Sequence, residues 1–335
     1  MVALTSASLR AELVSAPGPS LTASNAASSR LDDILRPAGA LARLDDHAVW
    51  LARWQGTAAP SIEHPVALIF AGDHGVTEEG VSVYPSEVTS AMLAAFHAKK
   101  ASVSAMASVA GAAVHAIDVG VGRPTGNLRV EAAMSAGRFA EAFDVGRAAT
   151  ADLDADLLIL GEMGIGNTTA AAAVAAALLG PEAAPFVGRG TGLDDDALAK
   201  KAQVVTDAVT RIDGVDDPLE VLRQVGGTEL VAIAGAMVEA RIRSIPVLLD
   251  GYIATSPALA LCRVDPGFTA NMRAGHLSAE PGHRLVLDEL GFEPLLTLDM
   301  RLGEASGAMA AVPLLSMACR LLTDVPTFAE WFSDE

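Results

Sequence analysis

Two acidic residues follow strand-like apolar runs and precede alanine-rich, helix-like runs. Glu162 lies in DLLILGEMGIGN (156–167), and Glu304 lies in LDMRLGEASGAMAA (298–311). A carboxylate at a strand end can be partly desolvated, which raises its pKa towards the range useful for a general base. Two such acids on neighbouring loops would suit acid–base or glycosyl-transfer chemistry. Each could instead be a helix-start acid that only compensates the helix dipole.

Small residues after Glu162 could bind an anion. Gly164, Gly166 and Asn167 lie between a strand-like run and a helix-like run. Backbone N–H groups and the helix dipole favour phosphate at such a position. The spacing is neither the G-x-G-x-x-G of dinucleotide folds nor a Walker loop. Because turns also need glycine for purely structural reasons, a phosphate site and a structural turn both remain open.

A second glycine-containing segment, GRGTGLDDDALAKK (188–201), also precedes a helix-like run. Asp194 is expected to cap that helix, and Lys200 and Lys201 follow two turns later. A lysine and a helix start could share one phosphate. Taken alone, the pair is better interpreted as a solvated lysine face.

Two loops carry residues that could bind a substrate or a metal. The segment AGDHGVTEEGVSVYPSEVT (71–89) is a long loop after the first strand-like run, suited to form the wall of a binding site, with Ser86 expected to cap the next helix. Asp73 and His74 do not complete a metal-ligand set, so a hydrogen-bonded structural pair is the better interpretation. A metal site is also unsupported in the segment 275–291, which offers His276, Ser278, Glu280 and His283.

The elements that must position these residues alternate along the chain. Continuous rather than alternating apolarity predicts strands that are covered on both faces. Strand followed by helix, repeated, predicts an α/β fold: a three-layer α/β/α, Rossmann-like, doubly wound parallel sheet. In such sheets ligands bind beyond the carboxyl ends of the strands, where the glycine-rich segments fall. The expected strands lie in 65–75, 112–122, 156–167, 245–254 and 294–300, and the expected helices in 86–110, 168–179, 194–213 and 228–243.

The chain ends lack this alternation. In residues 1–60 the sequence predicts helices that are interrupted by the segments APGPS and LRPAGALARLDD. We predict that they form a small helical subdomain that packs with a C-terminal helix in 310–335. Residues 61–309 are then the Rossmann-like catalytic domain.

Composition limits the partners. The formal net charge of −18 over 335 residues opposes binding to nucleic acid or to an anionic membrane. Arg10 and Glu12 interrupt the apolar core that an export signal would need, and the most apolar run, 168–180, is shorter than the ~20 residues of a membrane-spanning helix. Cys262 and Cys319 suggest neither a metal site nor a disulfide framework. A cytoplasmic protein without membrane insertion is expected.

Seven segments of the chain, listed at the end of this paragraph, resemble those of a known family in their order and spacing. The chain is similar, over about residues 66–328, to the nicotinate-nucleotide:dimethylbenzimidazole phosphoribosyltransferases of cobalamin nucleotide-loop assembly. The resemblance implies transfer of phosphoribose from nicotinate mononucleotide to 5,6-dimethylbenzimidazole, with inversion at C1′, giving α-ribazole 5′-phosphate and nicotinate. It also implies a homodimer and no metal or other cofactor. The segments are AGDHGVTEEGVSVYPSEVT, GEMGIGNTTAAAA, GRGTGLDDDALAKK, GGTELVAIAGAM, PVLLDGYIATSPAL, GHLSAEPGH and DMRLGEASGAMAA.

The resemblance also implies roles for individual residues. The general base of the family falls on Glu304, and its second important acid falls on Glu162. The phosphate-binding lysine falls on Lys201, one residue from Lys200. Phosphate and ribose contacts fall on Gly164, Gly166, Asn167, Ser278 and Gly303, and the base pocket falls on Ser82, Tyr84, Leu302 and Ser86, where many relatives carry glutamine.

Two other functions fit the same residues. One is a related phosphoribosyltransferase that uses another base or a phenolic acceptor, because a pocket distinguishes single methyl groups by only ~1–3 kcal/mol. The other is a non-catalytic nucleotide-binding module. The presence of Glu304, Glu162 and Lys201 together argues against the second.

Overall fold

A parallel sheet of five strands forms the centre of the protein. The computed structural model describes residues 4–180, 182–190 and 192–333. The strand order is β2-β1-β3-β4-β5. β2 lies on one side of β1, and the later strands β3, β4 and β5 follow on the other side, so the order of the strands reverses at the β1–β3 pair. This confirms the predicted α/β fold. The strands are β1 (Pro65–Gly72), β2 (Ala113–Gly120), β3 (Leu157–Met163), β4 (Val247–Leu249) and β5 (Met272–Ala274).

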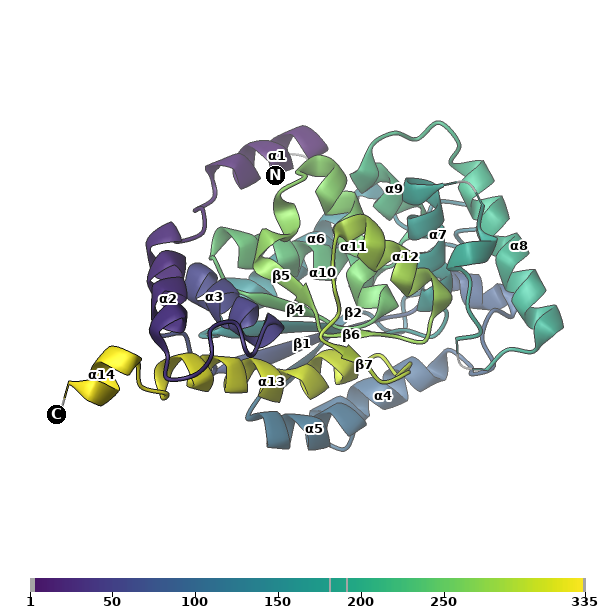
Figure 1. Cartoon of the computed structure of the whole chain (residues 1–335). Coiled ribbons are helices and arrows are strands. Elements are labelled where there is room, and N and C mark those ends of the chain that lie inside the picture. The colour runs from purple at the N-terminus through teal and green to yellow at the C-terminus, as the bar shows by residue number, and fades with distance from the viewer. Residues whose placement is uncertain (1–3, 181, 191, 334–335) are drawn as a thin grey trace.

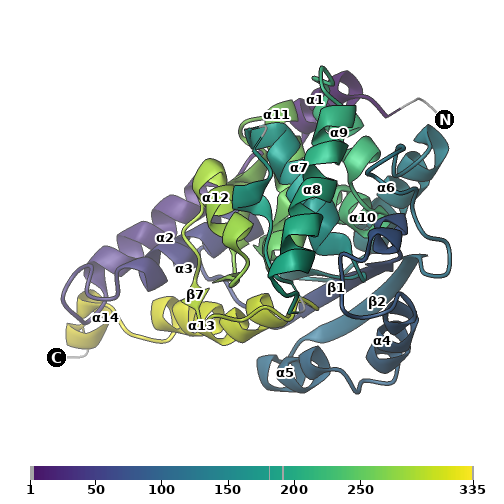
Figure 2. The same cartoon turned by 90° about the vertical axis from the view of Figure 1, so that its right-hand side faces the viewer.

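Helices cover both faces of the sheet, which makes three layers (Figures 1 and 2). Alternate residues of β1 divide between two cores: Leu68 and Phe70 join one, and Ala67 and Ile69 join the other. This division is the period of two that a strand imposes on its side chains. The helices are α4 (Glu87–His97), α5 (Ser102–Ala110), α6 (Ala136–Ala151), α7 (Asn167–Leu179), α8 (Asp195–Arg211), α9 (Pro218–Val225), α10 (Thr228–Ile242), α11 (Tyr252–Val264), α12 (Pro281–Leu290) and α13 (Ser306–Thr323), with short 3₁₀ helices at Gly75–Glu79, Ala184–Phe186 and Phe268–Asn271.

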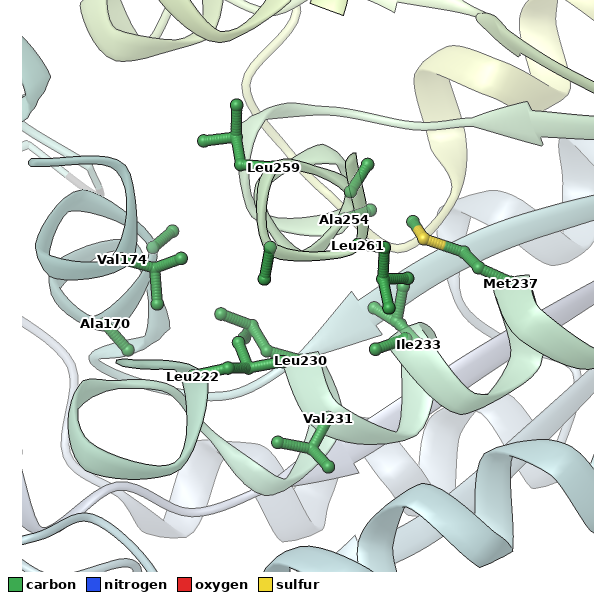
Figure 3. Close-up of a cluster of buried hydrophobic side chains, with 14 of the residues drawn as sticks. Ala170, Val174, Leu222, Leu230, Val231, Ile233, Met237, Ala254, Leu259 and Leu261 are labelled. Carbon is green, nitrogen blue, oxygen red and sulfur yellow. The ribbon is translucent and has the colours of Figure 1, made fainter. Parts of the chain in front are cut away.

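The larger core joins α7, α9, α10 and α11. Figure 3 shows Val174, Leu222 and Leu230, from α7, α9 and α10, directed into the space between these helices and α11. In α10, Leu230 through Ala234 are all fully buried, so this helix is enclosed on every side. Such a helix has no polar face to mark it as amphipathic, and its alanine and glycine content permits close neighbours.

The helices of the chain ends lie beside one another. α2 (Leu21–Asp33) and α3 (Arg43–Gln55) share a small core with α13, whereas α1 (Ser6–Ser15) contributes Leu9 and Leu13 to the larger core. A β-bridge joins Ile34 to Thr327, just before the last helix, α14 (Phe328–Phe332). The predicted division into 1–60 with 310–335 and 61–309 stays a prediction; residue 310 falls inside α13, and residues 1–3, 334 and 335 lie outside the described residues.

Two predicted elements were wrong. The single helix expected over 86–110 is two helices, because Lys99 adopts the left-handed conformation (φ +56°) and turns the chain between α4 and α5. The strand expected over 294–300 contains only β7 (Leu296–Thr297), which pairs with β6 (His276–Leu277) in a separate sheet of two strands. β5, of three residues, is too short to leave a periodic signal and was not predicted.

Helix α13 is long and apolar enough to meet the length and composition criteria for a membrane span, with a mean hydropathy of 1.3. It is instead packed inside the fold, against α3, α5 and the sheet. Of the residues of α13, 56% are buried. A core helix meets the same criteria, so its apolarity is explained by its position in the layer.

Helices α6 and α10 approach so closely that only glycine fits between them. A Cβ atom on Gly146 of α6 would overlap the carbonyl oxygen of Ala232, and one on Gly235 of α10 would overlap that of Phe143. Gly137, also in α6, has open space around its Cα. The chain therefore contains a close-packed glycine and a matched exposed glycine in one helix.

We expect Gly146→Ala to lower the free energy of unfolding by about 1–3 kcal/mol, because the two helices must separate to admit the methyl group. Gly137→Ala is the control and should be neutral, or stabilising by up to ~1 kcal/mol, because alanine favours helix. Urea unfolding followed by circular dichroism measures both. Equal stability of the two variants would contradict the close packing.

Candidate active site

A cavity of about 320 Å³ opens at the carboxyl ends of the strands. Loops that follow β1, β3, β4 and β6 line it, together with the turn before α13. Ten of the predicted site residues meet in this cavity: Glu162, Glu304, Gly164, Gly166, Asn167, Ser278, Gly303, Ser82, Tyr84 and Leu302.

Glu304 lies in a turn with an unusual backbone. Gly303, Glu304 and Ala305 have φ angles of +81°, +62° and +65°, a region that residues with a Cβ rarely adopt. The side chain of Glu304 is buried, and its Oε2 has no hydrogen-bond partner within the described residues. Burial raises the pKa of Glu304. The turn thus places a buried carboxylate, one oxygen of which is unpaired, in the wall of the cavity.

Glu162 lies directly against this turn. Its backbone oxygen accepts a hydrogen bond from the N–H of Glu304 (3.3 Å), and a Cβ on Gly303 would be 2.5 Å from Glu162 Oε1. The side chain amide of Asn167 donates to the other oxygen of Glu162. Burial, and then the charges of Asp250 and Glu229, raises the pKa of Glu162 to about 8. At neutral pH Glu162 is therefore protonated.

The turn Gly164–Asn167, which leads from β3 into α7, lines the cavity. Gly166 precedes the helix with φ +92°, and no side chain caps the helix N-terminus. Backbone N–H groups at such a start can bind an anion. Beneath the turn, His74 Nε2 lies 2.6 Å from Glu229 Oε1, and both side chains are fully buried. The pairing predicted for His74 was therefore wrong: its partner is Glu229, and Asp73 accepts from the N–H of Gly122 (2.7 Å).

Lys201 is buried behind the cavity wall and is not part of the lining. Its Nζ donates to Thr168 Oγ1 (2.8 Å) and to the carbonyl oxygen of Gly188 (3.0 Å). Burial lowers the pKa of Lys201 to about 8, and the charge of Glu280 opposes that shift. Thr168 itself lines the cavity, so the ammonium group lies one side chain behind the surface.

Lys200 differs from its neighbour in every respect that matters here. Its side chain is exposed, near Gly80. Lys200 is therefore a solvated lysine, whereas Lys201 is buried and is not part of a solvated lysine face. The expected N-cap is confirmed, because the Asp194 side chain accepts from the N–H of Ala197 (2.9 Å); residue 191 of this segment lies outside the described residues.

The loop after β1 forms the more apolar wall. Ser82, Tyr84 and Leu302 line the cavity, and Tyr84 and Leu302 are each 53% exposed at its mouth. Ser86 does not line it. The Ser86 hydroxyl donates to Thr77 Oγ1 (3.1 Å) and not to the start of α4, so the expected cap was wrong. The contact from Ser86 to the acceptor base stays a prediction.

No group of three or more potential metal ligands occurs in the described ranges. His276, Ser278 and Glu280 line the cavity, and His283 accepts a hydrogen bond from the N–H of Ser278 (3.0 Å). His283 therefore orients the Ser278 loop.

Sequence reasoning missed two buried acids, Asp250 and Glu229. Asp250 follows β4 in the segment PVLLDGY, the same placement after an apolar run that singled out Glu162. That signal could have found it. Glu229 lies within a helix, where an acid in the first turn is common and carries no such signal.

Known proteins share this sequence and architecture. The model of a family described as phosphoribosyltransferase, DBI_PRT, matches residues 16–331. Nicotinate-nucleotide–dimethylbenzimidazole phosphoribosyltransferases of Cereibacter sphaeroides and Methylorubrum extorquens are 44% and 46% identical, over 97% and 89% of this chain and 96% and 87% of theirs. The crystal structure of CobT from Thermus thermophilus has a TM-score of 0.88 at 42% identity, covering 92% of this chain and 98% of that one.

The pKa of Glu162 predicts how stability depends on pH. Its folded-state value of about 8 lies above the ordinary 4.5, so its stabilising contribution is complete below about pH 4.5 and is lost as pH rises towards 8. Glu162→Gln removes this loss. Between pH 5 and 8, the free energy of unfolding should fall more in the wild type than in the variant, by at least about 1 kcal/mol. Urea titrations at both pH values measure it, and parallel curves would mean that Glu162 ionises freely.

Proposed function

This chain belongs to the phosphoribosyltransferase family of the nicotinate-nucleotide–dimethylbenzimidazole enzymes, and from this premise we propose how its site performs their reaction. The enzyme transfers the phosphoribosyl group of nicotinate mononucleotide to 5,6-dimethylbenzimidazole and releases nicotinate. The observation that carries the mechanism is the position of Glu304 in the cavity wall, with a buried carboxylate that has no ion-pair partner within the described residues.

Glu304 acts as the general base. One benzimidazole nitrogen attacks C1′ as the C1′–N bond to nicotinate breaks. The bonding electron pair neutralises the departing pyridinium ring, so no metal is required to stabilise the leaving group. Attack from the opposite face inverts C1′ and gives α-ribazole 5′-phosphate. The other benzimidazole nitrogen becomes acidic as positive charge develops, and its proton passes to Glu304.

Glu162 has the complementary role. Because it is protonated at neutral pH, it can donate a hydrogen bond to an oxygen of the ribose. Its neutral state also avoids a second negative charge beside Glu304, which must stay ionised to accept a proton. Two neighbouring acids with different environments thus take different parts in the reaction.

The donor phosphate binds at the start of α7. The uncapped N–H groups after Gly166 and the positive end of the helix dipole favour an anion there. Thr168 lines the cavity with its hydroxyl held by Lys201 Nζ, so the lysine supports the phosphate site from behind. These contacts act at short range and are compatible with the acidity of the whole protein, whose field is screened over ~8 Å.

The acceptor ring lies against the loop after β1. Val88, Met92, Tyr84 and Leu302 give this part of the cavity an apolar surface suited to a flat, neutral heterocycle. Holding the acceptor and the donor on either side of one ribose contributes to catalysis through positioning. The homodimer and the cytoplasmic location stay predictions.

Product analysis tests the function directly. Purified protein is mixed with nicotinate mononucleotide and an equimolar mixture of 5,6-dimethylbenzimidazole, benzimidazole, adenine and a phenol. We expect nicotinate release and α-ribazole 5′-phosphate as the main product. A different main product would mean that another compound is the preferred acceptor. No release of nicotinate would favour a non-catalytic nucleotide-binding module.

We expect Glu304→Gln to lower kcat by about 10²-fold or more while leaving the KM for nicotinate mononucleotide nearly unchanged, because the amide cannot accept the proton. Asp299→Asn is the matched control: Asp299 is exposed, lies outside the cavity lining and adopts a positive φ that asparagine tolerates. Steady-state kinetics of both variants decide the assignment. Turnover near that of the wild type in Glu304→Gln would remove it as the base.

Adjacent lysines provide a test of the phosphate site. Lys201→Ala should raise the KM for nicotinate mononucleotide about tenfold or more, because Thr168 loses its support and the site loses a cation. Lys200→Ala, one residue away but exposed, should change it little. Initial rates at varied donor concentration give both values. A larger effect from Lys200, or a change confined to the acceptor KM, would contradict this assignment.

A further inference from the structure

We propose that Asp250 is a positioning residue for the transfer reaction, which holds the turn that carries Glu304 by binding the backbone at the start of α13. The inference rests on the proposed function, because it concerns the group that receives the acceptor proton. Asp250 does not line the cavity, so it acts through Glu304 rather than on the substrates.

The start of α13 depends on Asp250 for its cap. The residue before the helix is Ala305, whose methyl side chain cannot accept a hydrogen bond. Asp250, directly after β4, supplies the missing acceptor: its Oδ1 accepts from the N–H of Ala308 (2.9 Å). The backbone groups of Gly307, Gly251 and Ala305 are also close enough to oppose the rise in the pKa of Asp250. Unpaired N–H groups at a buried helix start need such an acceptor.

The turn just before that helix start needs to be held in place. Glu304 and Ala305 both carry a Cβ and both have positive φ, a combination that persists only where the surroundings impose it. Two contacts come from β3: the Glu162 carbonyl accepts from the N–H of Glu304, and a Cβ on Gly161 would overlap the backbone of Ala305. Asp250 holds the other side of the turn from β4.

Asp250 is not neutralised by an ordinary ion pair. The side chain is fully buried, and the nearest basic group is His276 Nε2, 3.6 Å from Oδ1. Burial lowers the pKa of His276 to about 4, so this imidazole is neutral at neutral pH. Asp250 Oδ2 has no side-chain or backbone hydrogen-bond partner assigned within the part of the chain described. A buried carboxylate with one backbone hydrogen bond and no charged partner is costly, which indicates a specific use.

The charge of Asp250 also reaches the other acid of the site. It raises the pKa of Glu162, on the neighbouring strand, and burial raises the pKa of Asp250 itself to about 7. Titratable groups near Asp250 include Glu162 at the end of β3 and His276 of β6, and Glu229 and Glu304 also act on Glu162. Loss of the Asp250 charge should therefore alter the pH dependence of turnover as well as its size, which a purely structural cap would not do.

The test uses Asp250→Asn, with Asp250→Ser as a smaller second variant. The matched control is Asp217→Asn. Asp217 caps α9 by accepting from the N–H groups of Leu219 and Glu220, and it is not among the residues that line the cavity. Circular dichroism verifies folding, and kcat, KM and the pH profile of kcat are measured for each variant.

The proposal predicts that Asp250→Asn lowers kcat by about 10²-fold, because a small displacement of the base is enough to cause such a loss. The KM for nicotinate mononucleotide should change by less than about threefold. The pH profile of kcat should shift, and adding Asp250→Asn to Glu304→Gln should cause little further loss. Asp217→Asn should have the kinetics of the wild type.

Several results would overturn the proposal. They are an unchanged kcat and pH profile, losses that multiply in the double variant, or failure of both Asp250 variants to fold, which would make the carboxylate purely structural. A crystal structure of Asp250→Asn adds a readout that does not require activity: the Gly303–Ala305 turn should move, and an unmoved turn would also overturn the proposal. An inactive wild type would refute the function alone.

Discussion

The site depends on how the start of α13 is held against the sheet. Gly161 of β3 leaves room for Ala305, Gly275 leaves room for Ala308, and Gly307 leaves room for His276. A Cβ atom at any of these three glycines would overlap the neighbouring residue. These close approaches press a strained turn onto the ends of β3 and β4. Glu304 is carried by that turn, so its position is determined by backbone packing rather than by a hydrogen bond to its own side chain.

Burial gives the clustered acids different properties. Glu162, Asp250 and Glu304 lie at the same edge of the sheet, and burial raises the pKa of each. Their hydrogen bonds differ: the Asn167 amide donates to Glu162, the N–H of Ala308 donates to Asp250 Oδ1, and Glu304 Oε2 has no partner within the described residues. These different environments are what the proposed roles require: a neutral donor, a residue that anchors the backbone, and a base within one small region.

The proposed phosphate site, in a protein of net charge −18, likewise depends on short-range contacts. The N-terminus of α7 presents backbone N–H groups, and Lys201 is the cation behind them. Glu280 accepts from the N–H of Gly190 (3.1 Å) and places a negative charge near that lysine. The carboxylate favours the charged form of Lys201, which burial alone disfavours.

The sequence by itself determined the strand–helix alternation, the parallel sheet and the loops that meet at its carboxyl edge, because continuous apolar runs and glycine turns are local signals. It also singled out Glu162 and Glu304, since an isolated charge beside an apolar run is visible in one dimension. Tertiary structure decided what local signals cannot encode. The burial of Lys201 and exposure of Lys200, the pairing of His74 with Glu229, and the bond from Asp250 to α13 join segments that are distant in the sequence. Such contacts depend on how layers pack, and packing fixes both the partners of a buried polar group and its pKa.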